Sequence, residues 1–324
     1  MKLFCAVILF SVWPLMTFAS MKVGVLAPEG TKWADLLKEM SKEIKTKTNS
    51  RVEFKIFYGG AQGDEPDVLR KMRNGLMQGG IFTGKTLGEI NGDLRVMEIP
   101  FTFFDDVKKG RATLEALTPF FNKHLEKSGM INLGFFEIGL VYLVSQKKLQ
   151  SLKDLDGVKF WAWEGDTLVD AMIKRMKLIA VPLPLPDVLS SLSTRIVEAA
   201  YSPPLAIVAL QWNSKVKFLL NYPITYSIGA FLVDQKSWKK VAVTDQAIVQ
   251  KVVKDYFSKV DEANRIENSE SLTILKNQNK VEFTTFSKEE FDKAREVRKG
   301  VINDLEGKLF SKEALQLLEK NTKI

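Results

Sequence analysis

The chain has 324 residues, which is enough for about two domains of ordinary size. Hydrophobic residues make up 45% of it and charged residues 27%, a composition typical of a soluble globular protein and unlike that of a disordered chain. The formal net charge is +8, but the basic residues are interspersed and form no block or recognition motif. We therefore expect a solvated basic surface and no nucleic-acid partner.

The first twenty residues have the pattern of a secretory signal peptide. Lys2 precedes an apolar run over residues 3–13, and small residues such as Ala19 follow. The run is shorter than the roughly 20 apolar residues that span a bilayer. We predict that residues 1–20 are removed by cleavage after Ala19 or Ser20, the alternative being a buried first helix. Export to the periplasm follows from the first interpretation.

The first half of the mature chain alternates predicted strands with predicted helices. The clearest predicted helix is amphipathic, with Lys and Glu on its polar face. Its apolar face holds Trp33, Leu36, Leu37, Met40 and Ile44. Further strands are predicted at 21–26, 52–58, 77–83, 96–101, 130–136 and 140–145, and further helices at 65–74 and 106–127. This alternation predicts parallel α/β architecture.

The same alternation returns after the turn at residues 154–157. Strands are predicted at 158–163, 178–182 and 196–201, and helices at 167–176 and 187–193. Residues 244–280 then contain no Pro or Gly and repeat apolar residues at helical spacing, which predicts a helix roughly 50 Å long that bridges both domains. A short strand at 281–286 precedes a last helix, for which Ser287 and Glu290 form a predicted capping box.

Residues suited to catalysis are scarce. The chain has one histidine, His124, and its position on a predicted helix favours a packing or surface role over a catalytic one. The one cysteine, Cys5, lies in the predicted signal peptide. Soft metal sites are therefore excluded, and we find no nucleophile elbow, phosphate loop or dinucleotide fingerprint. The glycine-rich stretch at 59–63 is predicted to be a turn beside a cleft. We expect a protein that is not an enzyme and that carries no cofactor or metal.

Several spaced motifs resemble those of the solute-binding proteins of tripartite ATP-independent periplasmic (TRAP) transporters. The matching stretches follow one another in order over essentially the whole mature chain, at Pro28–Trp33, Gly59–Glu65, Val68–Gly75, Pro100–Phe103, Leu152–Lys159 and Val181–Val188. The resemblance implies a two-domain periplasmic-binding-protein fold, type II-like, whose domains close over a ligand and share a long helix. It also implies TRAP-type membrane permease subunits as partners. A tetratricopeptide-repeat partner, which some relatives use, is left open.

The resemblance suggests a division of the mature chain. The first α/β domain would hold residues 21–143 plus about 230–260. The second would hold residues 144–229 plus about 261–324, with the bridging and C-terminal helices.

The departures from the family pattern concern the ligand. The resemblance implies an arginine that clamps the ligand carboxylate at the position of Trp161, and a second arginine at the position of Val141. Tyr201 and Ser202 stand where the family has a polar pair beside the ligand. Because a desolvated carboxylate without a cationic partner is costly, we expect this chain not to bind the usual acids of the family.

Aromatic residues offer a different cleft. Trp161 and Trp163 are two apart on a predicted strand and therefore face the same side. We predict an apolar ligand site that also includes Val141, Glu137 and Ser202 and the further aromatic residues Trp33, Phe101, Phe136 and Tyr201. The lead hypothesis is a hydrophobic or uncharged, lipid-like ligand, since burying each methylene contributes about 0.8 kcal/mol.

Three alternatives for this cleft remain open at this stage. The aromatic side chains could instead fill an interdomain core, or form a cage for a quaternary ammonium with Glu137 or Glu164 as the counter-charge. The ligand could also be an atypical organic acid. For the whole protein, the alternative to a solute-binding subunit is a periplasmic lipid carrier or scaffold that needs no permease.

Overall fold

The computed structural model describes residues 18–104, 106–278 and 281–322. The predicted signal peptide therefore lies outside the described residues up to position 17. Residues 19 and 20, its last two, belong to the first strand, where they pair with Val52 and Glu53.

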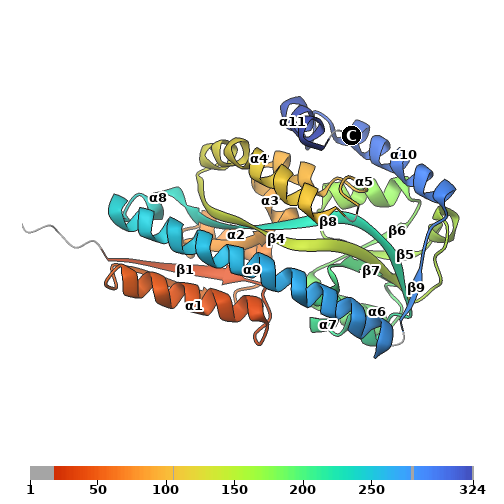
Figure 1. Cartoon of the computed structure of the whole chain (residues 1–324), viewed down its shortest axis with the longest axis horizontal. Helices are drawn as coiled ribbons and strands as arrows, with labels where there is room; N and C mark the ends of the chain where they lie inside the picture. Colours follow the sequence, from red (N-terminus) through yellow and green to blue (C-terminus); the bar gives the residue numbers. More distant parts are fainter. Residues whose placement is uncertain (1–17, 105, 279–280, 323–324) are drawn as a thin grey trace, which may run out of the picture.

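All of the described strands join one sheet in the order β2-β1-β3-β8-β4-β7-β5-β6, with β9 also paired to β8 (Figure 1). Their bounds are β1 Ala19–Val25, β2 Val52–Phe57, β3 Gly79–Thr83, β4 Met130–Ser145, β5 Lys159–Trp163, β6 Ile179–Leu183, β7 Ala199–Ser202, β8 Phe218–Asp234 and β9 Glu282–Thr284. The strands β2, β1 and β3 are parallel, and so are β7, β5 and β6. We call these two parallel groups, with their helices, the first and the second wing.

The two wings are held together by the long central strands. β4 and β8 have 16 and 17 residues and pair with each other in antiparallel fashion along most of their length. β8 contacts β3 of the first wing, and β4 contacts β7 of the second. The β4–β8 register shifts between Glu137 and Gly139, at the middle of the molecule. Both wings therefore grow from one continuous pair of strands.

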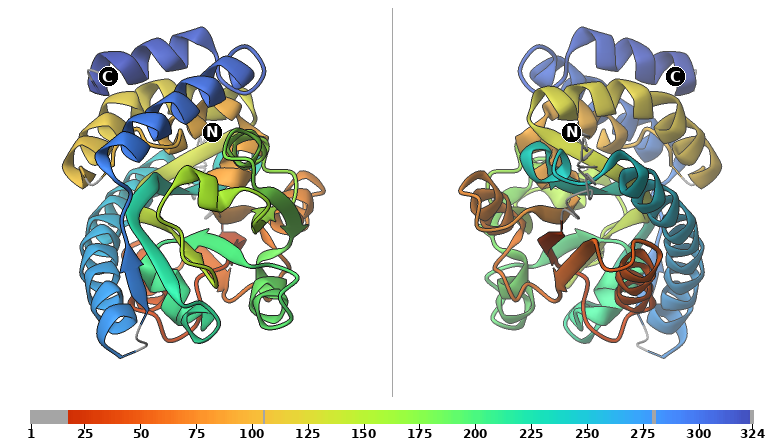
Figure 2. Two further views of the ribbon diagram at one scale, coloured as in Figure 1. Left: turned by 90° about the vertical axis from the view of Figure 1, so that its right-hand side faces the viewer. Right: turned by 90° about the vertical axis from the view of Figure 1, so that its left-hand side faces the viewer.

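Helices cover both faces of the sheet. They are α1 Lys32–Lys47, α2 Glu65–Arg73, α3 Gly84–Ile90, α4 Val107–Lys127, α5 Thr167–Arg175, α6 Val188–Ser193, α7 Pro204–Ala209, α8 Gln235–Trp238, α9 Val243–Asn277, α10 Lys288–Leu305 and α11 Lys312–Thr322, with short 3₁₀ helices η1 Gly92–Glu98, η2 Leu152–Leu155, η3 Leu185–Asp187 and η4 Trp212–Ser214. The helices α10 and α11 lie together at the same end of the molecule as α4 (Figure 2).

The predicted bridging helix is confirmed as α9, which has 35 residues. Its first half buries Val249, Val252, Val253, Tyr256 and Val260 against α1 and β4, and its second half packs on α7 of the second wing (Figure 1). It therefore contacts both wings. Ile266, however, is 50% exposed, because it lies off the helix face on which Val260, Asn264 and Ser271 are buried.

Most predicted elements are confirmed, but two predictions about strands are wrong. The apolar run at 96–101 is not a strand, since its first residues form the end of η1, where Leu94, Val96 and Met97 are buried on several sides. The separate strands predicted at 130–136 and 140–145 are one continuous strand, β4, in which the pairing register shifts between Glu137 and Gly139 without ending the strand. Half of the predicted capping box is formed, since Ser287 accepts the N–H of Glu290 at 3.3 Å, whereas Oε2 of Glu290 accepts the N–H of Leu152 at 2.7 Å.

The strand β8 and the helices α3, α7, α8 and α11 were not predicted. The division into two domains at the predicted boundaries stays a prediction. Among the residues that the structure describes, no helix is both long and apolar enough to cross a bilayer.

Candidate functional site

A cavity of about 170 Å³ lies between the two wings. None of the described residues that line it is charged, and most are apolar or aromatic. They come from the β1–α1 loop, β3, β4, β5, β7, α7, β8 and α9, and are Leu26, Pro28, Thr31, Trp33, Thr83, Ile138, Val141, Trp161, Trp163, Leu185, Tyr201, Ser202, Pro203, Leu205, Ala206, Ala209, Leu210, Ser227 and Asn264. We call this space the aromatic cavity.

Three neighbouring rings form one wall of the aromatic cavity. The Trp161 ring lies 5.9 Å from that of Trp163 and 5.0 Å from that of Tyr201. Trp161 is only 2% exposed, because Trp212 packs behind it at 5.3 Å and its indole N–H donates to the Leu183 carbonyl at 3.0 Å. The wall is therefore fixed from behind by the core of the second wing.

Six of the nine predicted site residues line the aromatic cavity, and they are Trp33, Val141, Trp161, Trp163, Tyr201 and Ser202. Phe101 does not, since it is 1% exposed and belongs to the core. Phe136 lies behind Trp33, with its ring 5.4 Å from that of Trp33 and 5.1 Å from that of Phe257. Neither Phe101 nor Phe136 lines the aromatic cavity, because both side chains pack in the core.

Glu137 also lies elsewhere. It is 2% exposed and accepts the Tyr226 hydroxyl at 2.8 Å, and Arg111 lies 3.7 Å from it. These groups line a separate groove of about 440 Å³ that α4 and α9 border. Glu164 is exposed and is not among the residues lining the cavity. Neither glutamate is placed as a counter-charge for an ammonium cage.

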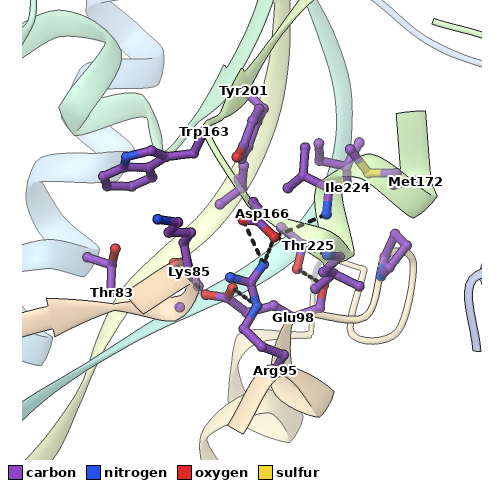
Figure 3. Close-up of a pocket in the computed structure, with 16 residues that line it drawn as sticks. Thr83, Lys85, Arg95, Glu98, Trp163, Asp166, Met172, Tyr201, Ile224 and Thr225 are labelled. Atoms are coloured by element: carbon purple, nitrogen blue, oxygen red, sulfur yellow. Dashed lines mark hydrogen bonds and ion pairs between the residues drawn. The ribbon is translucent and has the colours of Figure 1, made fainter. Parts of the chain in front are cut away.

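A second, smaller compartment of about 70 Å³ adjoins the aromatic cavity (Figure 3). The two spaces share the lining residues Thr83, Val141, Trp163, Tyr201 and Ser227. Unlike the aromatic cavity, this compartment is lined by ionisable side chains, which are Lys85, Arg95, Glu98, Asp166 and Tyr201. We call it the charged compartment.

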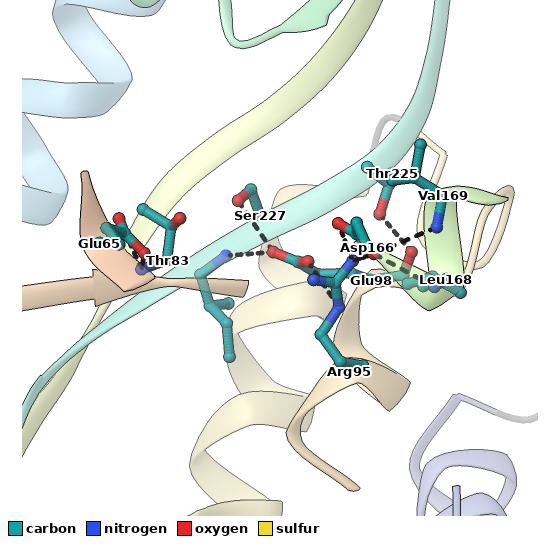
Figure 4. A network of polar contacts seen from close by, with 10 residues as sticks. Glu65, Thr83, Arg95, Glu98, Asp166, Leu168, Val169, Thr225 and Ser227 are labelled. Carbon is teal, nitrogen blue, oxygen red and sulfur yellow. Dashed lines mark hydrogen bonds and ion pairs between the residues drawn. The ribbon is translucent and has the colours of Figure 1, made fainter. Parts of the chain in front are cut away.

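The charged compartment is organised around Arg95, which is 4% exposed (Figure 4). Its Nη2 lies 3.0 Å from both carboxylate oxygens of Asp166. Its Nε lies 3.3 Å from Oε2 of Glu98, whose Oε1 accepts the Ser227 hydroxyl at 2.9 Å. Two carboxylates therefore face one guanidinium in a site closed to bulk water.

The electrostatics follow from this burial. Burial opposes the charge on Arg95, but the carboxylates of Asp166 and Glu98 raise its pKa, so the guanidinium stays charged. Burial raises the pKa of Glu98 against the opposing effect of Arg95. Burial also raises the pKa of the Tyr201 hydroxyl, which stays a neutral group at the boundary of the two compartments.

Two polar contacts cross from one wing to the other above the cavity. Arg95 belongs to η1 in the first half of the chain, and Asp166 follows β5 of the second wing. Close to them, the indole N–H of Trp163 donates to Asp64 Oδ2 at 2.9 Å, and Asp64 is the N-cap of α2. These contacts close the two wings over the site.

Sequence reasoning missed Arg95, Asp166 and Asp64 as site residues. Arg95 and Asp166 are 71 residues apart, and neither belongs to a motif that marks a charged pair. The one available signal was Asp64, which ends the glycine-rich stretch that we predicted to lie beside a cleft.

The chain is similar to known proteins over most of its length. A family model described as bacterial extracellular solute-binding protein, family 7, matches residues 23–308. An uncharacterised protein of Haemophilus influenzae is 25% identical over 218 residues, which are 67% of this chain and 66% of that protein. The chain thus spans about two thirds of the length of the first curated relatives that it matches, 66% of one and 65% of another.

Solved structures share the fold. A TRAP periplasmic solute-binding protein of Haemophilus influenzae with bound L-gulonate superimposes with a TM-score of 0.85 at 22% identity, covering 94% of this chain and 99% of that one. The sugar acid binding protein DctPAm of Advenella mimigardefordensis, in complex with galactonate, superimposes with a TM-score of 0.86 at 19% identity, covering 95% and 98%. The predicted fold class is thereby confirmed.

Proposed function

Because the chain belongs to family 7 of the bacterial extracellular solute-binding proteins, we propose that it is the extracytoplasmic receptor of a TRAP-type transporter, with a hydrophobic or uncharged cargo. Family membership makes it a binding protein rather than an enzyme. Its partners in this proposal are a small-molecule ligand and the membrane permease subunits that receive it. Its site of action is the periplasm, which it reaches by means of the predicted signal peptide.

The observation that carries the choice of cargo is the uncharged wall of the aromatic cavity. A carboxylate buried there would lose its hydration without gaining a cation, at a cost of several kcal/mol. Trp161 and Val141 stand where the resemblance implies arginines, and both line the cavity. Trp161, Trp163 and Tyr201 instead offer ring faces, against which apolar groups pack well.

The size of the cavity limits the part of the cargo that fits in the closed form. At about 170 Å³ it is close to an engineered cavity of about 150 Å³ that admits benzene. One ring or a short alkyl chain therefore fits between the closed wings. Each buried methylene would contribute about 0.8 kcal/mol to binding. A longer cargo needs the wings to part.

The cargo is tested by native mass spectrometry of the protein purified gently from its own periplasm, followed by release and identification of the bound molecule. An uncharged or lipid-like molecule is the expected result. A single small carboxylate would overturn the choice of cargo while leaving the receptor function intact. A hydrophobic cargo in a cell whose genome lacks a permease of this type would favour the free-standing lipid carrier.

A cavity-filling variant tests where the cargo binds. Ala206 lines the aromatic cavity on α7, so Ala206→Phe should place a ring in the space that the cargo occupies. We expect the affinity for the identified cargo to fall at least tenfold, as measured by isothermal titration calorimetry, with the fold intact by circular dichroism. The matched control is Ala112→Phe at an exposed position of α4. Equal affinities in both variants would mean that the cargo binds elsewhere.

A further inference from the structure

Asp166 contacts the Arg95 guanidinium through a carboxylate, which is the group by which an organic acid would bind an arginine. Both of its oxygens lie 3.0 Å from Nη2 of Arg95, and it reaches the guanidinium from the opposite wing (Figure 4). Contact between a guanidinium and a carboxylate is among the strongest polar interactions in proteins, and it is the contact by which arginine recognises organic acids. Here the protein supplies both partners itself.

The position of this pair beside the aromatic cavity gives it consequences for the ligand. The charged compartment shares Thr83, Val141, Trp163, Tyr201 and Ser227 with the cavity, so a group bound at Arg95 would lie next to a ligand held by the aromatic wall. Lys85 and Arg95 are the cations among the described residues that line either space. Lys85 is already paired with Glu89. Arg95 is likewise paired, with Asp166, so an acidic ligand could reach this guanidinium only in place of that carboxylate.

Charge balance decides which anions this group can accept. Asp166 already forms an ion pair with Arg95, and Oε2 of Glu98 lies 3.3 Å from its Nε. A ligand carboxylate entering the same buried space would meet the Asp166 carboxylate, and like charges at such distances in a poorly solvated site repel strongly. Without Asp166, a ligand carboxylate would restore the balance that the protein has now.

We propose that Asp166 is a specificity-determining residue, which masks Arg95 and thereby excludes organic acids from a site that could otherwise bind them. This inference rests on the proposed function, since it explains why the receptor would take an uncharged cargo. In this proposal, the Asp166 carboxylate determines whether the receptor binds neutral molecules or acids. It also makes Arg95 a latent carboxylate-binding residue.

The variant that tests the proposal has to keep the second role of Asp166. Its Oδ1 caps α5 by accepting the N–H groups of Leu168 at 3.1 Å and Val169 at 3.2 Å. Serine is a good N-cap, but its side chain is too short to reach Arg95 as Asp166 does. Asp166→Ser therefore unmasks the guanidinium and keeps the cap. Asp166→Asn keeps the shape and removes only the charge.

The ligands for the test are phenylacetate and phenylacetamide, which have nearly the same shape and differ in charge. Calorimetric titration of both into the full-length mature protein gives the preference for the neutral molecule over the acid. We expect the wild type to prefer phenylacetamide, and Asp166→Ser to bind phenylacetate at least tenfold more tightly than the wild type does. Asp166→Asn should show a smaller gain in the same direction. Asp156→Ser, a change of the same kind at an exposed position directly after η2, should leave both affinities unchanged.

The outcomes separate this inference from the proposed function. If the wild type prefers phenylacetate, the choice of an uncharged cargo is wrong, whatever the variants do. If the wild type prefers the amide but neither Asp166 variant gains affinity for the acid, the masking role of Asp166 is overturned and the cargo proposal stands. Should Asp166→Ser fail to fold by circular dichroism, Asp166→Asn alone decides. A gain in Asp156→Ser as large as that in Asp166→Ser would also overturn it, because a general change of charge would then explain the effect.

Discussion

Glu65 is a buried acid at the edge of the site. It is 2% exposed at the start of α2, and its two carboxylate oxygens accept the backbone N–H of Thr83 at 3.1 and 2.9 Å (Figure 4). Burial raises the pKa of Glu65 to about 7, against the opposing effect of the Thr83 N–H. Since Thr83 lines both compartments, this carboxyl fixes part of the wall of the site.

The raised pKa makes the stability of the protein depend on pH. The folded state holds the proton of Glu65 more tightly than the unfolded state, so this proton stabilises the fold below about pH 4.5 and the benefit is lost as the pH rises to about 7. Glu65→Gln removes the dependence. We expect the free energy of unfolding of the variant, minus that of the wild type, to rise by up to about 3 kcal/mol from pH 5 to pH 8.

Urea unfolding of both proteins at pH 5 and pH 8 measures this gain. Glu313→Gln, at an exposed position of α11, is the control. The difference in free energy of unfolding between this variant and the wild type should be the same at both pH values. A constant difference between Glu65→Gln and the wild type would show that the carboxyl does not titrate in this range.

How far single residues could be predicted depended on whether their neighbours in sequence are also their neighbours in space. Trp161 and Trp163 were predicted to share a face because alternation along a strand is local, and both line the cavity. Arg95 and Asp166 meet only because two wings close on each other, and no local pattern carries that information. Phe136 was misplaced because a strand has two faces and the sequence does not say which one meets the ligand.

At the scale of elements, α9 does more than bridge the wings. Its residues Asp261, Asn264 and Asn268 lie on one face at a spacing of three and four and bind the bulge of β4. Asp261 accepts the Glu137 N–H at 2.7 Å, Asn264 donates to the Glu137 carbonyl at 2.7 Å, and Asn268 donates to the Ile138 carbonyl at 2.9 Å. These bonds satisfy the backbone groups that the bulge withdraws from the sheet, immediately behind the cavity wall at Ile138.

Asn264 therefore stabilises the strand through its amide. It is 3% exposed, so Asn264→Ala would leave the Glu137 carbonyl buried without that donor. We expect the free energy of unfolding to fall by about 1–3 kcal/mol, as measured by urea unfolding. Glu270→Ala, at an exposed position one and a half turns further along the same helix, should change it by less than about 0.5 kcal/mol. Equal losses in both variants would mean that the Asn264 amide makes no specific contribution to stability.

Elements with an amphipathic pattern were predicted well, and continuously apolar ones were not. The helices α1 and α9 have one apolar face each, which fixes both their type and their orientation. The run at 96–101 is apolar throughout, and periodicity cannot tell a buried strand from a buried 3₁₀ turn. The strand β8 was missed although it is the longest, because Pro223 and the polar residues near it break the pattern where the strand passes between the wings.

At the scale of the whole molecule, the two wings are closed on each other. They share the continuous strands β4 and β8, which allow the wings to move relative to each other only by bending. Across the opening, the wings meet through Arg95 with Asp166 and through Trp163 with Asp64. The aromatic cavity lies between the shared strands and these contacts. Cargo larger than one ring can therefore enter only after the cross-wing contacts break.

The indole N–H of Trp163 gives a way to weaken closure without changing the charge of the site. Trp163→Phe keeps an aromatic ring in the wall but removes the hydrogen bond to Asp64, a bond to a charged acceptor that contributes about 1.5–3 kcal/mol. We expect the population of the open form in the absence of cargo to increase by about tenfold or more. Hydrogen exchange at residues 163–170 should accelerate accordingly, and the radius of gyration from solution scattering should increase.

Trp161→Phe is the matched control, because it removes an equivalent indole bond that stays inside the second wing, from Trp161 to the Leu183 carbonyl at 3.0 Å. That variant should lose stability, since it leaves a carbonyl without its donor, but its wings should stay closed. If both variants accelerate exchange at residues 163–170 equally and neither changes the radius of gyration, the Trp163–Asp64 bond does not hold the wings together. Acceleration and expansion in Trp163→Phe alone would identify the bond as part of the closure through which cargo must pass.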